Sequence, residues 1–201
     1  AMSGTPELIT FDIFGTVLDW RTGLAAACKA AGRQLRAGEF DRIIDVQGKL
    51  EQGVFLDYAE ITCRSLMQVI GLHSAVAGEI GASVGQWALY GDSPTALRAL
   101  MRSAPCAAMT NSDRVHGEQI QRQLGFRLDD WLCAEEARVY KPHPNFWDIM
   151  ASRRGVKPSP RWWHVSAYAD YDLAVANDLG LTTVFVERPH ARSGAASHSV
   201  R

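Results

Sequence analysis

The sequence lacks the long apolar stretches and the excess of one charge that mark two large classes of protein. No run approaches the ~18 apolar residues of a membrane-spanning helix, and no charged segment leads into an apolar stretch as in a secretory signal. The formal net charge is only −1, so no basic field is present to gather nucleic-acid phosphates or acidic lipids. We therefore expect a cytoplasmic protein that binds a small molecule, with no nucleic acid and no membrane as partner.

Cysteine and histidine are too scattered to predict a structural zinc site. The 4 cysteines form no Cys-x-x-Cys pair and no Cys/His ligand spacing, so we expect reduced thiols. His116, His143 and His164 show no paired spacing either, and we interpret them as surface or loop residues. These residues predict neither a metal nor a cofactor.

Apolar residues make up 47% of the chain, and their spacing along it alternates between two patterns. Short β-rich runs are separated by segments with apolar residues every three or four positions, and several of these segments end at glycine. This alternation predicts an α/β fold built on a parallel sheet with right-handed crossovers. The predicted strands are Glu7–Asp12, Cys106–Thr110, Trp162–Ser166 and Thr182–Val186, with a weaker candidate at Cys133–Val139.

Residues 21–90 differ from the rest because their apolar residues recur only with helical spacing. No strand is predicted there, so we expect a helical lobe inserted after the first strand. The α/β core then comprises residues 1–20 and 91–201.

Polar and charged residues gather where the predicted strands end. Asp12 closes the first strand, Asn111 follows the second, and Asp172 lies shortly after the third. Lys141 lies on a loop before a predicted helix and can reach the same edge. Ligands of open parallel sheets bind beyond the carboxyl ends of the strands, so we expect these segments to form one cleft, covered by the helical lobe.

Four short motifs, in this order, resemble those of the haloacid dehalogenase superfamily. Phe11–Asp19 (FDIFGTVLD) resembles the first motif, Thr110-Asn111 the second, Lys141-Pro142 the third, and Asp172 the last acidic position of the fourth. Their order and spacing match from residue 7 to about 188. The resemblance implies a Rossmann-like core in which the helical lobe is the cap.

The resemblance also implies roles for the three charged residues. Asp12 would attack the substrate at carbon or phosphorus and form an ester intermediate, which replaces one hard displacement with two easier steps. Lys141 would lie beside Asp12 and Asp172 and keep both ionised, since an opposite charge favours the charged form. Asp172 would orient Lys141 or the water that hydrolyses the ester.

Three uncharged residues would complete this predicted site. Thr16 and Thr110 would donate hydrogen bonds to the carboxylate of Asp12 or of the substrate. Asn111 would position the substrate or its leaving group. None of these roles requires a metal.

Two positions depart from the pattern of the superfamily's phosphatases. Those enzymes carry a second aspartate two residues after the nucleophile, where this chain has Phe14, which cannot protonate a leaving alcohol. They also bind magnesium through an aspartate of the fourth motif, where this chain has Ala167. Magnesium prefers hard oxygen ligands, and Asp170 is close in sequence but out of register.

The same departures suit the displacement of a halide, which leaves without protonation. That reaction requires in-line approach of a carboxylate to carbon in a dry pocket, and an aromatic residue at Phe14 favours such a pocket. The 2-haloacid dehalogenases carry an aromatic residue there, and the segment Gly15–Arg21 resembles that of the type II, or L-2-haloacid, enzymes.

The resemblance to the dehalogenases has gaps in the cap and after the third motif. Their halide-binding arginine in the early cap aligns with no arginine here, and we propose the nearby Arg42 as its replacement. A tyrosine that follows the lysine of the third motif aligns with Trp147, which we expect to line the substrate pocket. Serine and asparagine positions of the fourth motif are Ala167 and Ala169.

Three hypotheses about function follow from these residues. The first is metal-independent hydrolysis of a short 2-haloalkanoic acid through an Asp12 ester. The second is a magnesium-dependent phosphatase of a small phosphoester, and the third is a catalytically degenerate protein on the same scaffold. By analogy with related caps, the chain could form a homodimer.

Overall fold

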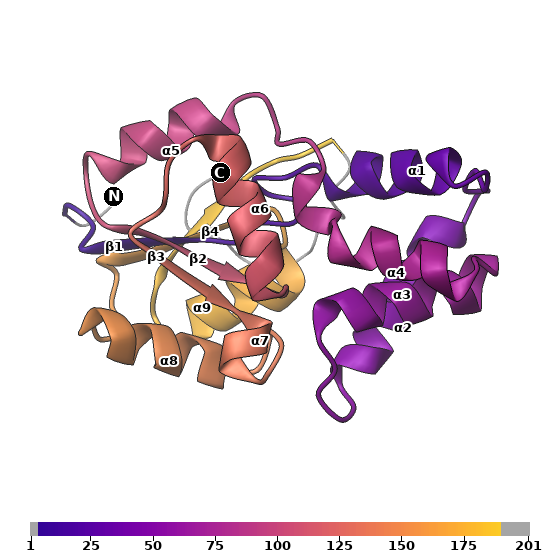
Figure 1. Ribbon diagram of the computed structural model, residues 1–201. Coiled ribbons are helices and arrows are strands. Elements are labelled where there is room, and N and C mark those ends of the chain that lie inside the picture. The colour runs from indigo at the N-terminus through magenta and orange to yellow at the C-terminus, as the bar shows by residue number, and fades with distance from the viewer. Residues whose placement is uncertain (1–3, 190–201) are drawn as a thin grey trace.

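The structure, a computed structural model, describes residues 4–189 and contains one five-stranded parallel sheet (Figure 1). The strand order is β3-β2-β1-β4-β5, which places the first strand at the centre. The strands are β1 (Leu8–Phe11), β2 (Cys106–Thr110), β3 (Asp130–Cys133), β4 (Trp162–Ser166) and β5 (Thr182–Phe185). This arrangement confirms the predicted α/β fold.

Helices cover both faces of the sheet and form a separate group at one end (Figure 1). In that view α5 and α6 lie over one face, and α7 and α8 lie over the other. The helices are α1 (Trp20–Ala30), α2 (Glu39–Glu51), α3 (Tyr58–Ile70), α4 (Ser74–Ala82), α5 (Ser93–Met101), α6 (Arg114–Leu124), α7 (Ala134–Ala137), α8 (Asn145–Arg154) and α9 (Ala174–Asp178), with the short elements η1 (Val84–Gln86) and η2 (Ala169–Leu173).

Strand β1 lies between two parallel neighbours, and both of its faces are buried because helices cover both sides of the sheet. Successive side chains of a strand point to opposite faces. Ile9 and Phe11 accordingly pack on one side of the sheet and Leu8 packs on the other. Continuous apolar runs are typical of strands covered on both sides, which is why this strand could be predicted from its sequence.

The strand predicted at Cys133–Val139 is wrong in its position. Strand β3 covers Asp130–Cys133 instead, and residues 134–137 form helix α7. Ala134 and Ala137 are buried at a spacing of three residues, which is a helical rather than an extended pattern.

The helices between β1 and β2 form a helical cap inserted after the first strand, as predicted. The chain leaves and re-enters the core through two segments that run side by side. The Asp19 amide donates to the Ala88 carbonyl at 2.9 Å, and the Tyr90 amide donates to the Val17 carbonyl at 2.9 Å. Both crossings are therefore fixed to each other.

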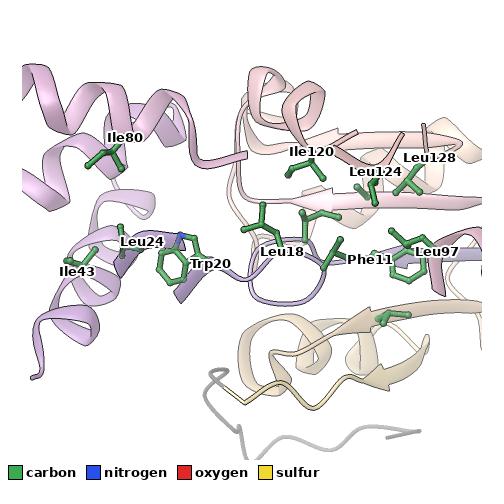
Figure 2. Close-up of a cluster of buried hydrophobic side chains, with 14 of the residues drawn as sticks. Phe11, Leu18, Trp20, Leu24, Ile43, Ile80, Leu97, Ile120, Leu124 and Leu128 are labelled. Carbon is green, nitrogen blue, oxygen red and sulfur yellow. The ribbon is translucent and has the colours of Figure 1, made fainter. Parts of the chain in front are cut away.

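One apolar cluster continues from the sheet into the cap (Figure 2). Phe11 and Leu97 lie at its core end, Leu18 and Trp20 lie at the crossing, and Ile43 lies within the cap. Because the same buried cluster serves both parts, apolar burial holds the cap against the sheet.

Polar groups of the core also bind backbone groups of the cap. The Asp113 carboxylate accepts hydrogen bonds from the amides of Tyr58 and Ala59 at 2.8 and 2.9 Å, at the first turn of α3. The Nε2 atom of His116 lies 2.8 Å from the Gly81 carbonyl. His116 is fully buried, so its interpretation as a surface residue is wrong. Within residues 4–189, no helix is long and apolar enough to cross a membrane.

Candidate active site

Asp12 lies directly after β1 at the centre of the sheet, and its carboxylate is held on both oxygens. Thr16 donates its hydroxyl to Oδ2 at 2.6 Å, and the Lys141 ammonium lies 3.2 Å from Oδ1. The turn from Asp12 to Thr16 needs glycine at position 15, where φ is +87° and a Cβ would collide with the Tyr168 hydroxyl. The first motif therefore folds into a tight loop that presents a fixed carboxylate.

Lys141 lies between two buried carboxylates. Its ammonium contacts Asp172 Oδ2 at 2.9 Å as well as Asp12, and all three side chains are almost completely buried. Burial alone lowers the pKa of Lys141, but Asp172 and Asp12 outweigh it and keep that pKa above its ordinary value. The lysine thus remains charged and partly neutralises both carboxylates.

The pKa values of the two carboxylates are shifted in opposite directions. Burial opposes ionisation of Asp172, but His164 and Lys141 more than compensate and hold its pKa well below the ordinary value. Burial raises the pKa of Asp12, and Lys141 offsets this only in part because the charge of Asp172 opposes it. Asp12 is therefore the more basic carboxylate, as suits a nucleophile.

Behind Asp172, a chain of buried hydrogen bonds runs into the sheet. His164 Nε2 lies 2.8 Å from Asp172 Oδ1, and His164 Nδ1 lies 2.7 Å from the Thr10 hydroxyl. Trp162 Nε1 donates to that hydroxyl at 2.9 Å. With its ring proton on Nε2, His164 donates to Asp172, and its Nδ1 accepts from the Thr10 hydroxyl. Every donor and acceptor of the chain then has a partner. His164 is fully buried on β4, so its interpretation as a surface or loop residue is wrong.

Asn111 holds the loop that carries Lys141. Its Oδ1 accepts the Lys141 amide at 2.7 Å, and its Nδ2 donates to the Lys141 carbonyl at 3.0 Å. The hydroxyl of Thr110 pairs with that of Ser112 at 3.0 Å rather than with the carboxylate of Asp12. Both residues of the second motif also line the cavity described next.

A cavity of about 940 Å³ lies between core and cap, with Asp12 and Lys141 in its wall. Its lining is hard to recognise from sequence, because the contributing side chains come from separate loops and helices. Nine aromatic residues line it: Phe14, Trp20, Phe40, Phe55, Tyr58, Tyr90, Tyr140, Tyr168 and Tyr171. The space in front of Asp12 is consequently mainly apolar.

Besides Asp12, Lys141 and Asp170, the cavity wall contains the charged side chains of Arg21 and Glu51 from the cap and Arg138 from the core. Arg21 stacks over the Phe40 ring at 4.4 Å, and Arg138 stacks over the Phe55 ring at 4.2 Å. Glu51 ends helix α2, and burial raises the pKa of its carboxyl to about 8, although Lys141 opposes that rise. None of the three was identified from the sequence.

Two predicted substrate-binding residues do not line the cavity. Arg42 is exposed on α2, whose cavity face presents Ile44 instead. Two residues along a helix are about 200° apart, so Arg42 points away from that face. Trp147 is buried in α8 beside His164, with ring centroids 5.8 Å apart, and packs behind the site.

Phe14, Ala167 and Asp170 are the three residues at which the sequence was compared with the phosphatases, and all three lie close to Asp12 or the cavity. Phe14 lines the cavity with its ring 5.9 Å from that of Tyr58. Ala167 is buried, and its amide donates to the Thr16 hydroxyl at 2.9 Å. Asp170 lines the cavity. Among residues 4–189, no group of three or more His, Cys, Asp or Glu side chains is arranged to hold a metal ion.

Comparison with known proteins relates this architecture to one group of enzymes. No family model and no curated protein matches the sequence. Among solved structures, the defluorinating L-2-haloacid dehalogenase Rha0230 superposes with a TM-score of 0.83 at 22% identity, covering 99% of this chain and 91% of that one. The L-2-haloacid dehalogenase PA0810 gives 0.81 at 26% identity, covering 96% and 90%.

A third solved structure shows the same likeness. The L-2-haloacid dehalogenase of Xanthobacter autotrophicus gives a TM-score of 0.75 at 20% identity, covering 91% of this chain and 78% of that one. The likeness includes the helical cap as well as the sheet, since nearly the whole chain is matched. This chain therefore has the fold of the L-2-haloacid dehalogenases of the haloacid dehalogenase superfamily, over nearly its whole length and at low sequence identity.

Proposed function

We propose that this protein is a metal-independent hydrolase that removes the halogen from a 2-haloalkanoic acid through an ester of Asp12. The observation that carries the proposal is the Asp12 carboxylate, which is buried, held on both oxygens and open to a mainly apolar cavity. A fixed carboxylate that faces a mainly apolar wall is suited to in-line attack on carbon.

The proposed reaction has two steps. In the first, a carboxylate oxygen of Asp12 bonds to C2 of the substrate, and the carbon–halogen bond breaks with its electron pair leaving on the halide. In the second, water adds to the Asp12 carbonyl carbon, and the bond between that carbon and the former Asp12 oxygen now attached to C2 breaks, so that the oxygen of water remains on Asp12. The products are the 2-hydroxy acid, one halide ion and one proton, and Asp12 is regenerated.

The neighbours of Asp12 would support both steps. Lys141 would limit charge build-up when the ester is cleaved, and Thr16 would keep the carboxylate aligned. Asp172, which contacts Lys141 and His164 and does not line the cavity, would act as a positioning residue for the lysine. Phe14 favours halide displacement over phosphate transfer, since the leaving halide needs no proton donor at that position.

The test is halide release from 2-chloro-, 2-bromo- and 2-fluoroacids by the purified protein with a metal chelator present. We expect release by the wild type, and none by Asp12→Ala and Asp12→Asn. Asp148→Asn makes the same chemical change at an exposed position of α8 and should keep full activity. Activity that survives in Asp12→Ala would refute the mechanism, whereas chelator-sensitive phosphate release would support the phosphatase hypothesis instead.

A further inference from the structure

The cavity is much larger than a short haloacid needs. A 2-halopropanoate has six non-hydrogen atoms, which at about 30 Å³ each, the volume of a water molecule in the liquid, occupy roughly 180 Å³. The cavity of about 940 Å³ is several times larger. Sites of about 300–1,000 Å³ are typical of drug-sized ligands. A three-carbon substrate would leave most of this space filled with water.

The chemistry of the wall matches a bulky apolar group rather than water. Aromatic side chains from both the cap and the core line the space, and rings such as these prefer to pack against other rings. Phe55 is itself stacked on Tyr140, with centroids 5.5 Å apart, across the boundary between cap and core. A wet cavity with this lining would leave a large apolar area in contact with water, at a cost that an apolar ligand removes.

Helix α2 leaves room for such a group. Its residues Phe40, Ile44, Gln47, Gly48 and Glu51 line the cavity, at the spacing of one helix face. A Cβ added at Gly48 would have no other atom within 4 Å. Glycine in the interior of a helix costs about 1 kcal/mol relative to alanine, and here it keeps the wall of the cavity open.

We propose that the substrate is a 2-haloacid whose C2 carries an aryl or long alkyl group, and that this group lies against Gly48 of α2. The reacting end of this substrate rests on the proposed function. The aryl or alkyl group at C2 is inferred from the size and lining of the cavity alone. An experiment can therefore refute either part of the proposal without refuting the other.

The experiment compares bromide release from 2-bromopropanoate, 2-bromo-octanoate and 2-bromo-3-phenylpropanoate by the full-length protein. We expect kcat/KM to be at least tenfold higher for one of the larger acids. Gly48→Leu should lower the ratio of kcat/KM for large over small substrate by at least tenfold. Gly78→Leu makes the same change in helix α4, where a Cβ also meets no atom within 4 Å and the cavity is not touched, and should leave the ratio unchanged.

A milder substitution guards against misfolding of the leucine variant. Gly48→Ala improves helix propensity, so it should fold at least as well as the wild type and lower the same ratio by a smaller factor. Circular dichroism would verify that each variant is folded. A higher kcat/KM for 2-bromopropanoate than for both larger acids would overturn the inference and leave the proposed function standing.

Binding of unreactive acids decides the matter if no haloacid is hydrolysed. That result would refute the proposed function, and calorimetry would then compare 3-phenylpropanoate with propanoate. Binding of the phenyl acid at least tenfold tighter, and weakened by Gly48→Leu but not by Gly78→Leu, would uphold a cavity for bulky acids. Equal affinity for the two acids, or no binding of either, would overturn it.

Discussion

Replacement of Glu51 by glutamine tests whether burial in the cavity wall raises the pKa of this carboxyl. Burial raises the pKa of this carboxyl from 4.5 to about 8, and Lys141 opposes that rise only in part. The folded protein therefore keeps a proton on Glu51 at pH values where the unfolded chain has released it. Glutamine has nearly the same shape and is neutral at every pH, so Glu51→Gln removes this linkage and little else.

The sign and size of the effect follow from the two pKa values. Below pH 4.5 the carboxyl is neutral in both states, and between 4.5 and about 8 only the unfolded chain ionises. The free energy of unfolding therefore falls as pH rises through that window and is constant above it. The full shift corresponds to about 5 kcal/mol, at about 1.4 kcal/mol for each tenfold change in proton affinity. Because the side chain is partly exposed, we expect about 2 kcal/mol.

Urea unfolding at pH 5, 6.5 and 8.5, followed by circular dichroism, measures this linkage. The free energy of unfolding of Glu51→Gln minus that of the wild type should increase by about 2 kcal/mol between the lowest and highest pH. Glu79→Gln, an exposed position of α4, should show no such trend. Parallel curves for Glu51→Gln and the wild type would mean that the carboxyl titrates as in water, and would refute the reasoning.

Three further predictions concern the polar and charged groups around Asp12. Lys141→Met leaves two buried carboxylates without their cation, so halide release should be lost and urea unfolding should show a destabilisation of about 3–5 kcal/mol. Asn111→Ala removes two hydrogen bonds to the Lys141 backbone, and kcat should fall about 10- to 100-fold while far-UV circular dichroism is unchanged; a normal kcat would contradict its positioning role. Arg21→Ala and Arg138→Ala should each raise KM for a haloacid about 5- to 10-fold, whereas Arg42→Ala, at a position that does not line the cavity, should not; a raised KM in Arg42→Ala alone would restore the original assignment of the halide site.

The parts of the fold that could be predicted are those encoded by neighbouring residues. A run such as Leu8–Phe11 is apolar on both faces and ends at a polar turn, so its sequence suffices to identify a central strand. The position of β3 could not be obtained in this way, because a short apolar segment is compatible with a helix or a strand. There the pairing of Trp131 with Ala108 of β2 decides the structure.

The candidate site also contains residues that could be identified from local sequence and residues that could not. Asp12, Lys141 and Asp172 were identified through motifs, and the structure brings them together in one buried cluster. His164 could not be recognised, because its partner Asp172 lies eight residues away on a different element and no sequence pattern marks the pair. Arg42 was chosen by its distance along the chain, whereas the side of the helix decides which residues reach the cavity.

The placement of Lys141 has a consequence for how the protein loses activity on heating. Its ammonium joins Asp12 beyond β1 to Asp172 beyond β4, and its backbone is bonded to Asn111 beyond β2. Three adjacent strands are thus linked at one edge through a single residue. A region tied in this way cannot open alone, so its amide protons should exchange with solvent only through global unfolding. Thermal inactivation and loss of the sheet should consequently be one cooperative event.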